Sequence, residues 1–508
     1  MGGQGTARRR CRRGLARRVV VLWALVAVPA LPGGASAVAA DPAAATAPEA
    51  GPQAFASEPN RTWGTSPSDY PNDANRDKAG RVYALAEVGT KVFVGGEFTG
   101  VTPPGVSTAA ARKDPTRVVH RSYLVALDVN TGALLDWDAH PDGPVLSLAP
   151  SADGTRLYVG GMFRSIGGGR FSRLASLDVA TGSADPTFAP PIPDAYVKAM
   201  ALSGPTLYIG GAFTRLGTDA RSQLAALDAR TGALHADWVP PPNAGGRFVG
   251  NTGKPTEDGN PGNVADLKVT PDGTMVVIGG SFLHFADRSG LIVLDGRTAK
   301  PTPWQPVLDR PRPVYGLDIW PTDGKTIFAA AGGYGGAIEA FTPGRSTKAI
   351  WVHKTDGDGT DAVATDSRVY FVGHYDYVLG NNTTCGGTSC TGGNAGDNLN
   401  RHIAAFDTRT GAQDTTFNAQ MNTPEGPEVA LIGAHHLYVG GNFTKVNFEA
   451  QPGFAQFPAS ADAGAARSTQ QAAPQGDDRC PVSAPSSPRR RAHAAAWPCS
   501  WARPRSPA

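Results

Sequence analysis

Short apolar runs that end in a pair of glycines recur along this chain of 508 residues. The first is KVFVGGEFTG (91–100), and close variants begin at residues 156, 206, 275 and 436. Each run is too short for a typical helix and is bounded by turn-forming residues, so it predicts a β-strand. Two degenerate copies, TIFAAAGG (326–333) and VYFVGHYD (369–376), bring the predicted number of glycine-pair strands to seven.

Three further segments accompany each glycine-pair strand. An apolar strand such as VYALA (82–86) precedes it, and in several copies an Asp-Gly turn such as TPDGT (270–274) lies between the two. A strand such as LAALD (224–228) follows, and then in most copies a D-x-x-T-G turn. Such short connections predict four antiparallel strands, a to d. The d segments carry an aromatic residue, namely Trp137, Phe188, Trp238, Trp304, Trp351 and Phe417.

An isolated sheet of this kind cannot bury both faces, whereas like sheets stacked around an axis can. The sequence therefore predicts an all-β fold, a seven-bladed β-propeller of four-stranded antiparallel blades over 60–460. Only six aromatic d strands follow the seven glycine-pair strands. The seventh is expected in NRTWGTS (60–66), so that an N-terminal strand carrying Trp63 closes the ring and leaves no open sheet edge.

The glycine pairs are interpreted as structural, because glycine lets neighbouring blades approach closely and no helix follows to bind a phosphate. The G-G-x-F-T and L-A-x-L-D strands resemble the delta-60-type β-propeller repeats of secreted bacterial proteins. The resemblance covers roughly 60–460, with five good copies and two eroded ones. It implies a propeller fold without an assigned activity.

The D-x-x-T-G turn with a trailing Trp also resembles quinoprotein propellers, which hold pyrroloquinoline quinone. In those proteins the Trp follows the Gly at one fixed spacing, but TGALLDW and TGALHADW differ by one residue. The adjacent-cysteine pair typical of several such dehydrogenases is also absent. A quinoprotein dehydrogenase therefore stays a minor alternative, and no cofactor is expected.

Charge is distributed unevenly along the chain. The formal charge of +3 comprises +7 in residues 1–40 and +4 in residues 461–508, which leaves −8 for residues 41–460. Seven Arg residues precede an apolar run (19–31) and ASA (35–37), a pattern typical of a secretory signal peptide. We therefore expect a signal peptide (1–40), a linker (41–59), the propeller and a disordered Ala/Pro/Arg-rich tail (461–508). The expected product is a secreted extracellular monomer that has no stable membrane anchor and binds no nucleic acid.

Cysteine usage fits this compartment. Cys385 and Cys390 bracket a Gly-rich loop and are expected to form a disulfide. A zinc site would need two further ligands, for which only His374 and His402 lie nearby, so no metal is expected. DGDGTD (356–361) resembles the start of a calcium loop but lacks the glutamate at the twelfth position, which favours a turn.

Long insertions fall only in b–c and d–a connections, at 100–120, 239–263 and 376–400, and these connections share one face of a propeller. Variation of this kind is typical of a binding surface. The predicted function is a non-catalytic binding scaffold for a polysaccharide or an extracellular protein. An extracellular glycan lyase or hydrolase is the alternative, although no catalytic motif or residue is identified. Candidate binding residues on this face are Arg247, Phe248, Glu257 and Asp258 in the second insertion and, in the sixth unit, His374, Tyr375, Tyr377, Arg401 and His402.

Overall fold

The computed structural model describes residues 54–66 and 79–460, with gaps at 244, 250–253, 257–259, 334, 380–383, 387–388, 392–397, 400–401 and 423–425. These residues belong to one compact unit, Gly51–Ala508. The predicted signal peptide and C-terminal tail lie outside the described residues, as do residues 41–53 of the predicted linker. The described part is all-β, with many small antiparallel sheets.

Seven antiparallel sheets with the same internal order contain most of the described strands. The first strand of each sheet, called the inner strand below, pairs with the glycine-pair strand, which pairs with a third strand. The inner strands are β2 (Arg81–Val88), β7 (Val145–Pro150), β10 (Val197–Ser203), β17 (Val264–Val269), β20 (Val314–Ile319), β24 (Gly359–Ala364) and β31 (Pro427–Ile432). The glycine-pair strands are β3 (Lys91–Glu97), β8 (Arg156–Gly161), β11 (Thr206–Gly211), β18 (Met275–Gly280), β21 (Ile327–Ala331), β25 (Arg368–Gly373) and β32 (His436–Gly441). The third strands are β6 (Leu124–Asp128), β9 (Leu174–Asp178), β14 (Leu224–Asp228), β19 (Leu291–Asp295), β22 (Ala337–Phe341), β30 (Ile403–Asp407) and β35 (Phe454–Pro458).

The fourth strand is regular in only one of these sheets within the described residues. In the fifth sheet β23 (Trp351–Lys354) pairs with β22. In five other sheets the aromatic segment makes a single bridge, such as Leu177 with Ala184. Proline explains part of the difference, because PTFAPP (186–191) and PTPWQP (301–306) lack N–H donors that AIWVHK (349–354) retains.

The two glycines of a pair have separate structural roles. A Cβ added to Gly95 would lie 2.6 Å from Cγ1 of Val145, on the inner strand of the next sheet, and one added to Gly96 would meet the carbonyl oxygen of Arg81. In the fifth sheet Ala330 takes the position of Gly95, and the next inner strand begins with Gly359 in the position of Val145. The fifth sheet therefore has the larger side chain at the glycine position, and the sixth sheet has the smaller one at the valine position.

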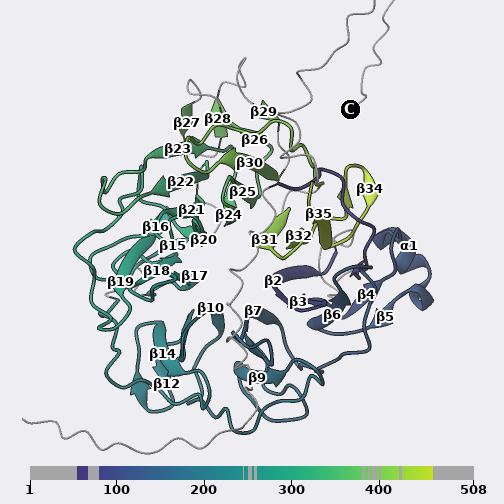
Figure 1. Cartoon of the computed structure of the whole chain (residues 1–508), viewed down its shortest axis with the longest axis horizontal. Coiled ribbons are helices and arrows are strands. Elements are labelled where there is room, and N and C mark those ends of the chain that lie inside the picture. The colour runs from purple at the N-terminus through teal and green to yellow at the C-terminus, as the bar shows by residue number, and fades with distance from the viewer. Residues whose placement is uncertain are drawn as a thin grey trace, which may run out of the picture. The chain divides into compact units, whose positions relative to one another are not determined.

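The hydrophobic core of the described residues is divided into seven clusters, each shared by consecutive sheets. In one cluster Phe93 and Trp137 of the first sheet pack with Leu157 and Val159 of the second. The inner strands contact one another in the order β2, β7, β10, β17, β20, β24, β31, and β31 contacts β2. Figure 1 shows these strands around a common centre, with the rest of each sheet farther out.

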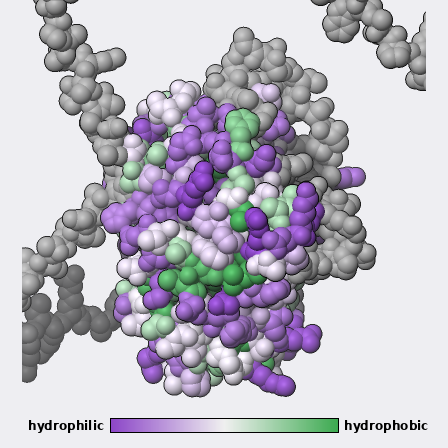
Figure 2. Space-filling model, turned by 90° about the vertical axis from the view of Figure 1, so that its right-hand side faces the viewer, coloured by the Kyte–Doolittle hydropathy of each residue, from purple (hydrophilic) through white to green (hydrophobic). Residues whose placement is uncertain are grey.

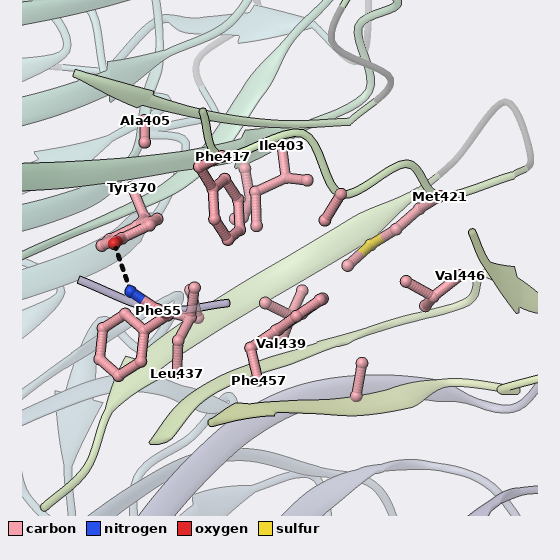
Figure 3. Packing of buried hydrophobic residues seen from close by; sticks show 14 of the residues in the cluster. Phe55, Tyr370, Ile403, Ala405, Phe417, Met421, Leu437, Val439, Val446 and Phe457 are labelled. Atoms are coloured by element: carbon pink, nitrogen blue, oxygen red, sulfur yellow. Dashed lines mark hydrogen bonds between the residues drawn. The ribbon is translucent and has the colours of Figure 1, made fainter. Parts of the chain in front are cut away.

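The N-terminal segment pairs with the last sheet. Asn60 N donates to Gln456 O of β35 at 2.7 Å, and Phe55 N donates to the Tyr370 hydroxyl at 3.2 Å within the cluster drawn in Figure 3. Trp63 packs against a cluster that contains Tyr438 of the last sheet. The paired residues lie mainly between 54 and 60, slightly before the predicted strand (60–66). Residues Gly64–Thr65 form β1, which pairs with β4 (Gly100–Thr102).

Small additional elements occupy the long insertions. The first contains α1 (Thr108–Lys113), the 3-10 turn η1 (Pro115–Arg117) and β5 (Val119–His120), and Ser107 caps α1 by accepting a bond from Ala110 N. The second contains β15 (Arg247–Val249) and β16 (Lys254–Thr256), and the third contains β26 (Tyr377–Val378), β27 (Thr384–Gly386), β28 (Ser389–Thr391) and β29 (Asn398–Leu399). Two short hairpins, β12 (Arg215–Leu216) with β13 (Asp219–Ala220) and β33 (Lys445–Val446) with β34 (Glu449–Ala450), extend other b–c connections. The surface on the side of α1 and β5 is mainly hydrophilic, with smaller hydrophobic areas (Figure 2).

Candidate functional site

A cavity of about 760 Å³ lies among the inner strands. Every one of the seven inner strands contributes to its wall, from Tyr83 on β2 to Glu428 on β31. Each inner strand begins after the connection from the preceding sheet, so its first residues lie at the end that carries the long insertions. We call this the long-loop end of the cavity.

A β-bulge directs one residue of each inner strand into the cavity. In β2, Val82 pairs with Gly96 and Ala84 with Gly95, which leaves Tyr83 as an extra residue. The same shift of register occurs near the start of all seven inner strands. A bulge re-aims the side chain of the extra residue. These seven residues, called the bulge ring below, all line the cavity and are Tyr83, Leu146, Lys198, Ala265, Tyr315, Thr360 and Glu428.

Acid–base groups gather next to the bulge ring at the long-loop end. His374 Nε2 lies 3.6 Å from Glu428 Oε1, and His374 N donates to Asp358 O at 2.7 Å. Burial raises the pKa of Asp358 to about 6, although a bond from Gly333 N and the nearby His374 favour the carboxylate. Burial also raises the pKa values of the Tyr83 and Tyr315 hydroxyls. Two tyrosine hydroxyls, the carboxyl groups of Asp358 and Glu428 and the His374 imidazole therefore line one region.

A second group of charges lies along β17, β20 and β24. Lys268 Nζ is 3.5 Å from Asp266 Oδ2. Burial disfavours the charged form of Lys268, but Asp266, Asp361 and Asp318 outweigh this effect and raise the pKa of the amine. Burial raises the pKa of Asp361 to about 8 and that of Asp318 to about 6, with Lys268 opposing both shifts.

These aspartates also join neighbouring inner strands. Asp266 accepts a bond from Leu317 N at 2.9 Å, Asp318 accepts one from Ala364 N at 2.7 Å, and Asp361 accepts one from Ala430 N at 2.9 Å. Each donor belongs to the next sheet along the chain. The second group of charges therefore has a structural role in addition to lining part of the cavity.

The structure brings one of the nine sequence-predicted binding residues, His374, to the cavity wall. Phe248, Tyr375 and His402 are buried in the packing of the insertions. The Tyr375 hydroxyl donates to Phe371 O at 2.7 Å, and Nδ1 of His402 lies 3.1 Å from Gly373 O. Arg247 lies on β15 and Tyr377 on β26, where the Tyr377 side chain is exposed. Glu257, Asp258 and Arg401 lie outside the described residues.

The two predicted disulfide partners face each other in the backbone of a small hairpin. β27 and β28 pair with Cys385 directly opposite Cys390. The side chains of these strands lie outside the described residues, so the disulfide stays a prediction. In DGDGTD, Asp356 accepts bonds from Asp376 N and Tyr377 N, and residues 359–361 belong to the start of β24. The described residues contain no group of three or more His, Cys, Asp or Glu placed to hold a metal ion.

The charged residues of the bulge ring were not recognised in the sequence. Lys198 and Glu428 lie within the runs VKAMA (197–201) and PEVAL (427–431), which otherwise look like ordinary apolar strands. Because the seven inner strands align with one another, a charge at the second position of some copies was an available signal. The direction in which such a charged side chain points depends on the bulge, and a bulge is a property of the pairing between two strands.

Comparison with known proteins does not identify the chain. No protein-family model matches it, and no curated protein matches it. Among solved structures, the crystal structure of the computationally designed Ika8 protein is similar to 75% of this chain and 96% of its own, at 13% identity and a TM-score of 0.40. This similarity is too low to support an argument. The described residues also contain no helix that could span a membrane.

Proposed function

We propose that this chain is a secreted seven-bladed β-propeller that binds a hydroxyl-rich extracellular ligand, a saccharide, in its central cavity. The closed order of contacts among the seven inner strands supports the propeller. The pairing of the N-terminal segment with β35 supports it as well, because that segment covers the outer edge of the last sheet. Closing a ring in this way removes exposed sheet edges.

The bulge ring is the observation that carries the binding proposal. Most framework positions repeat from sheet to sheet, as the valines beside the glycine pairs do. The bulge ring instead carries an acid, a base, two tyrosines, a threonine and two small or apolar residues at equivalent positions. Tyrosine offers a flat apolar face together with a hydroxyl, and carboxylates accept hydrogen bonds from hydroxyl groups. Both features suit the alternating apolar and polar faces of a sugar ring.

Access from the long-loop end agrees with the distribution of exposed apolar side chains. Four of the six large hydrophobic residues that the described residues expose, Met162, Ile192, Tyr377 and Phe448, lie in b–c connections or beside them, at this end. Exposed apolar side chains at the end from which the cavity opens suit additional contacts with an extended ligand. The other two, Val239 and Val307, lie near the c–d turns of the opposite end.

Binding to a panel of oligosaccharides tests the proposal. The purified secreted chain is expected to bind at least one saccharide, and Glu428→Gln and Tyr315→Phe are each expected to weaken that binding about tenfold, the effect of losing one good hydrogen bond. Asp128→Asn, in an exposed turn of the opposite end, serves as the control and should bind like wild type. Binding that is absent throughout the panel, or unaffected by both cavity substitutions, contradicts the proposal.

Secretion requires a separate measurement. Protein recovered from the medium of an expressing culture is expected to begin after Ala37 by N-terminal sequencing, because ASA (35–37) provides the small residues of a cleavage site. Retention of the uncleaved chain inside the cell would count against this part of the proposal.

A glycan hydrolase or lyase is the second candidate function. It is favoured by Asp358, whose pKa of about 6 suits an acid–base group, close to His374 and Glu428. Polysaccharide turnover that disappears in both Asp358→Asn and His374→Ala, with binding retained, supports catalysis. Binding without any turnover leaves the scaffold function in place.

A further inference from the structure

The positive charge of the bulge ring is the starting point of this inference. Lys198 lies on β10 and lines the cavity. No hydrogen bond or ion pair joins its amine to another residue in the part of the chain that the structure describes. Its neighbours in the bulge ring are Leu146 and Ala265, which offer no acceptor side chain.

The other cations of the cavity wall already have partners. Lys268 is held by Asp266 at 3.5 Å, and Arg81 interacts with the Tyr83 hydroxyl. Lys198 differs because only the longer-range fields of Glu428 and Asp266 act on it. Burial lowers the pKa of the Lys198 amine, although Glu428 and Asp266 favour its charged form. The two carboxyl groups therefore do not fully offset the cost of burying the positive charge. An anionic ligand group would supply the missing charge and accept its hydrogen bonds.

The arrangement of the bulge ring separates two kinds of recognition. In its cyclic order Lys198 is the third residue and Glu428 the seventh, which is the largest separation that seven positions allow. Tyr83 and Tyr315 lie on either side of Glu428, Tyr83 one sheet away and Tyr315 two sheets away in the same order. One side of the cavity therefore offers a cation and the opposite side a carboxyl group, and a tyrosine hydroxyl lies on each path between them, two sheets from Lys198.

We propose that the saccharide bound in this cavity is acidic and that its carboxylate or sulfate group binds the Lys198 amine, while its hydroxyl groups face Glu428 and the two tyrosines. This proposal rests on the saccharide-binding function proposed above. It adds the charge class of the ligand and the residue that selects it.

The test uses an array that contains neutral, uronic-acid and sulfated oligosaccharides, followed by titration of each hit against its neutralised form. Methyl esterification neutralises a uronate, and desulfation neutralises a sulfated sugar. Acidic glycans are expected to bind, and their neutralised forms to bind about tenfold to 100-fold more weakly, as expected for the loss of a charge-assisted hydrogen bond. The uronate and sulfate arms identify which anion the lysine prefers.

Three variants test the assignment to Lys198. Lys198→Met is expected to weaken binding of the acidic glycan to the level of its neutralised form, whereas Lys198→Arg should retain most of the preference. Lys325→Met removes the same charge from an exposed turn and should change nothing.

The outcomes separate this inference from the proposed function. Hits confined to neutral glycans, or an acidic preference that survives in Lys198→Met, overturn the inference and leave saccharide binding in place. An array without any hit overturns both. Lys198→Arg keeps the positive charge. If this variant has a normal unfolding midpoint but no longer prefers acidic glycans, the result counts against a contact based on charge alone.

Discussion

Neighbouring sheets contact one another in two different ways on the two sides of the cavity. Between the first and second sheets the contact is apolar, since Val145 lies over Gly95. The sixth sheet contacts the seventh through a polar bond, in which Asp361 accepts from Ala430 N at 2.9 Å. Gly160, Gly210 and Gly440 repeat the apolar contact, and Asp318 repeats the polar one. The boundary between the fourth and fifth sheets combines both, because Val314 lies over Gly279 and Leu317 N donates to Asp266.

The polar contacts occur around the sheets whose glycine pairs are eroded. The fifth and sixth sheets carry Ala330 and Val372 at the position of Gly95. A Cβ added to Gly316 of the fifth sheet would meet Cα and Oδ1 of Asp361, so this glycine lets the sixth inner strand approach. The comparison teaches that one repeated framework can be joined by shape complementarity or by hydrogen-bonded carboxyl groups.

Removing Asp361 is expected to have the largest effect on stability. Asp361→Ala leaves the buried N–H groups of Ala362 and Ala430 without their acceptor, which should cost about 3 kcal/mol. Asp361→Asn retains an acceptor and should cost about 1 kcal/mol. Denaturant or thermal midpoints measure both, and equal midpoints for wild type and Asp361→Ala would refute the role of the polar contact.

The polar contacts should also make stability depend on pH. The pKa of Asp361 is raised by burial to about 8, so its favourable contribution is complete below about pH 4 and is lost as the pH rises toward 8. Glu339, whose pKa burial likewise raises to about 8, acts in the same direction. Asp361→Asn does not titrate, so its midpoint should fall less than that of wild type between pH 5 and 8.5.

A matched control for this measurement is Asp128→Asn. Bonds from Thr131 lower the pKa of Asp128 below its usual value, so its contribution is lost only as the pH falls below about 4. Between pH 5 and 8.5 this variant should follow the wild-type curve. A wild-type slope in Asp361→Asn would show that Asp361 is not the source of the pH dependence.

The apolar contacts are tested by exchanging volume between two sheets. Gly95→Ala places a Cβ 2.6 Å from Val145 Cγ1 and should cost about 1–3 kcal/mol through overpacking. Val145→Ala makes room for it, so the double variant should be more stable than the sum of the single effects by about 1 kcal/mol. The natural pair Ala330 and Gly359 is the precedent. Simple additivity of the two substitutions would contradict the proposed contact.

The repeated strands of the framework could be predicted from the sequence, but the residues of the cavity could not. The seven glycine-pair strands and their partners were predicted, because short runs bounded by turn residues specify hairpins locally. Regular d strands were predicted in sheets where the aromatic segment makes only a single bridge, and proline accounts for part of these cases. Phe248 and Tyr375 were chosen because they lie in or beside long insertions, yet both side chains are buried. Lys198 and Glu428 were missed because a bulge that spans two strands sets their direction.

The smallest expected effect comes from Ser147, which takes the position of Asp266 and Asp361 in the second sheet. Its hydroxyl donates to Val197 O of the next sheet at the long distance of 3.5 Å, and the carbonyl has a second lone pair for other donors. Ser147→Ala should therefore change the free energy of unfolding by less than about 0.5 kcal/mol. Chemical denaturation beside Asp361→Ala measures the contrast. If the serine proved as important as the aspartate, polar bonding would support the apolar side as well, and the two sides of the cavity would no longer differ in how their sheets are joined.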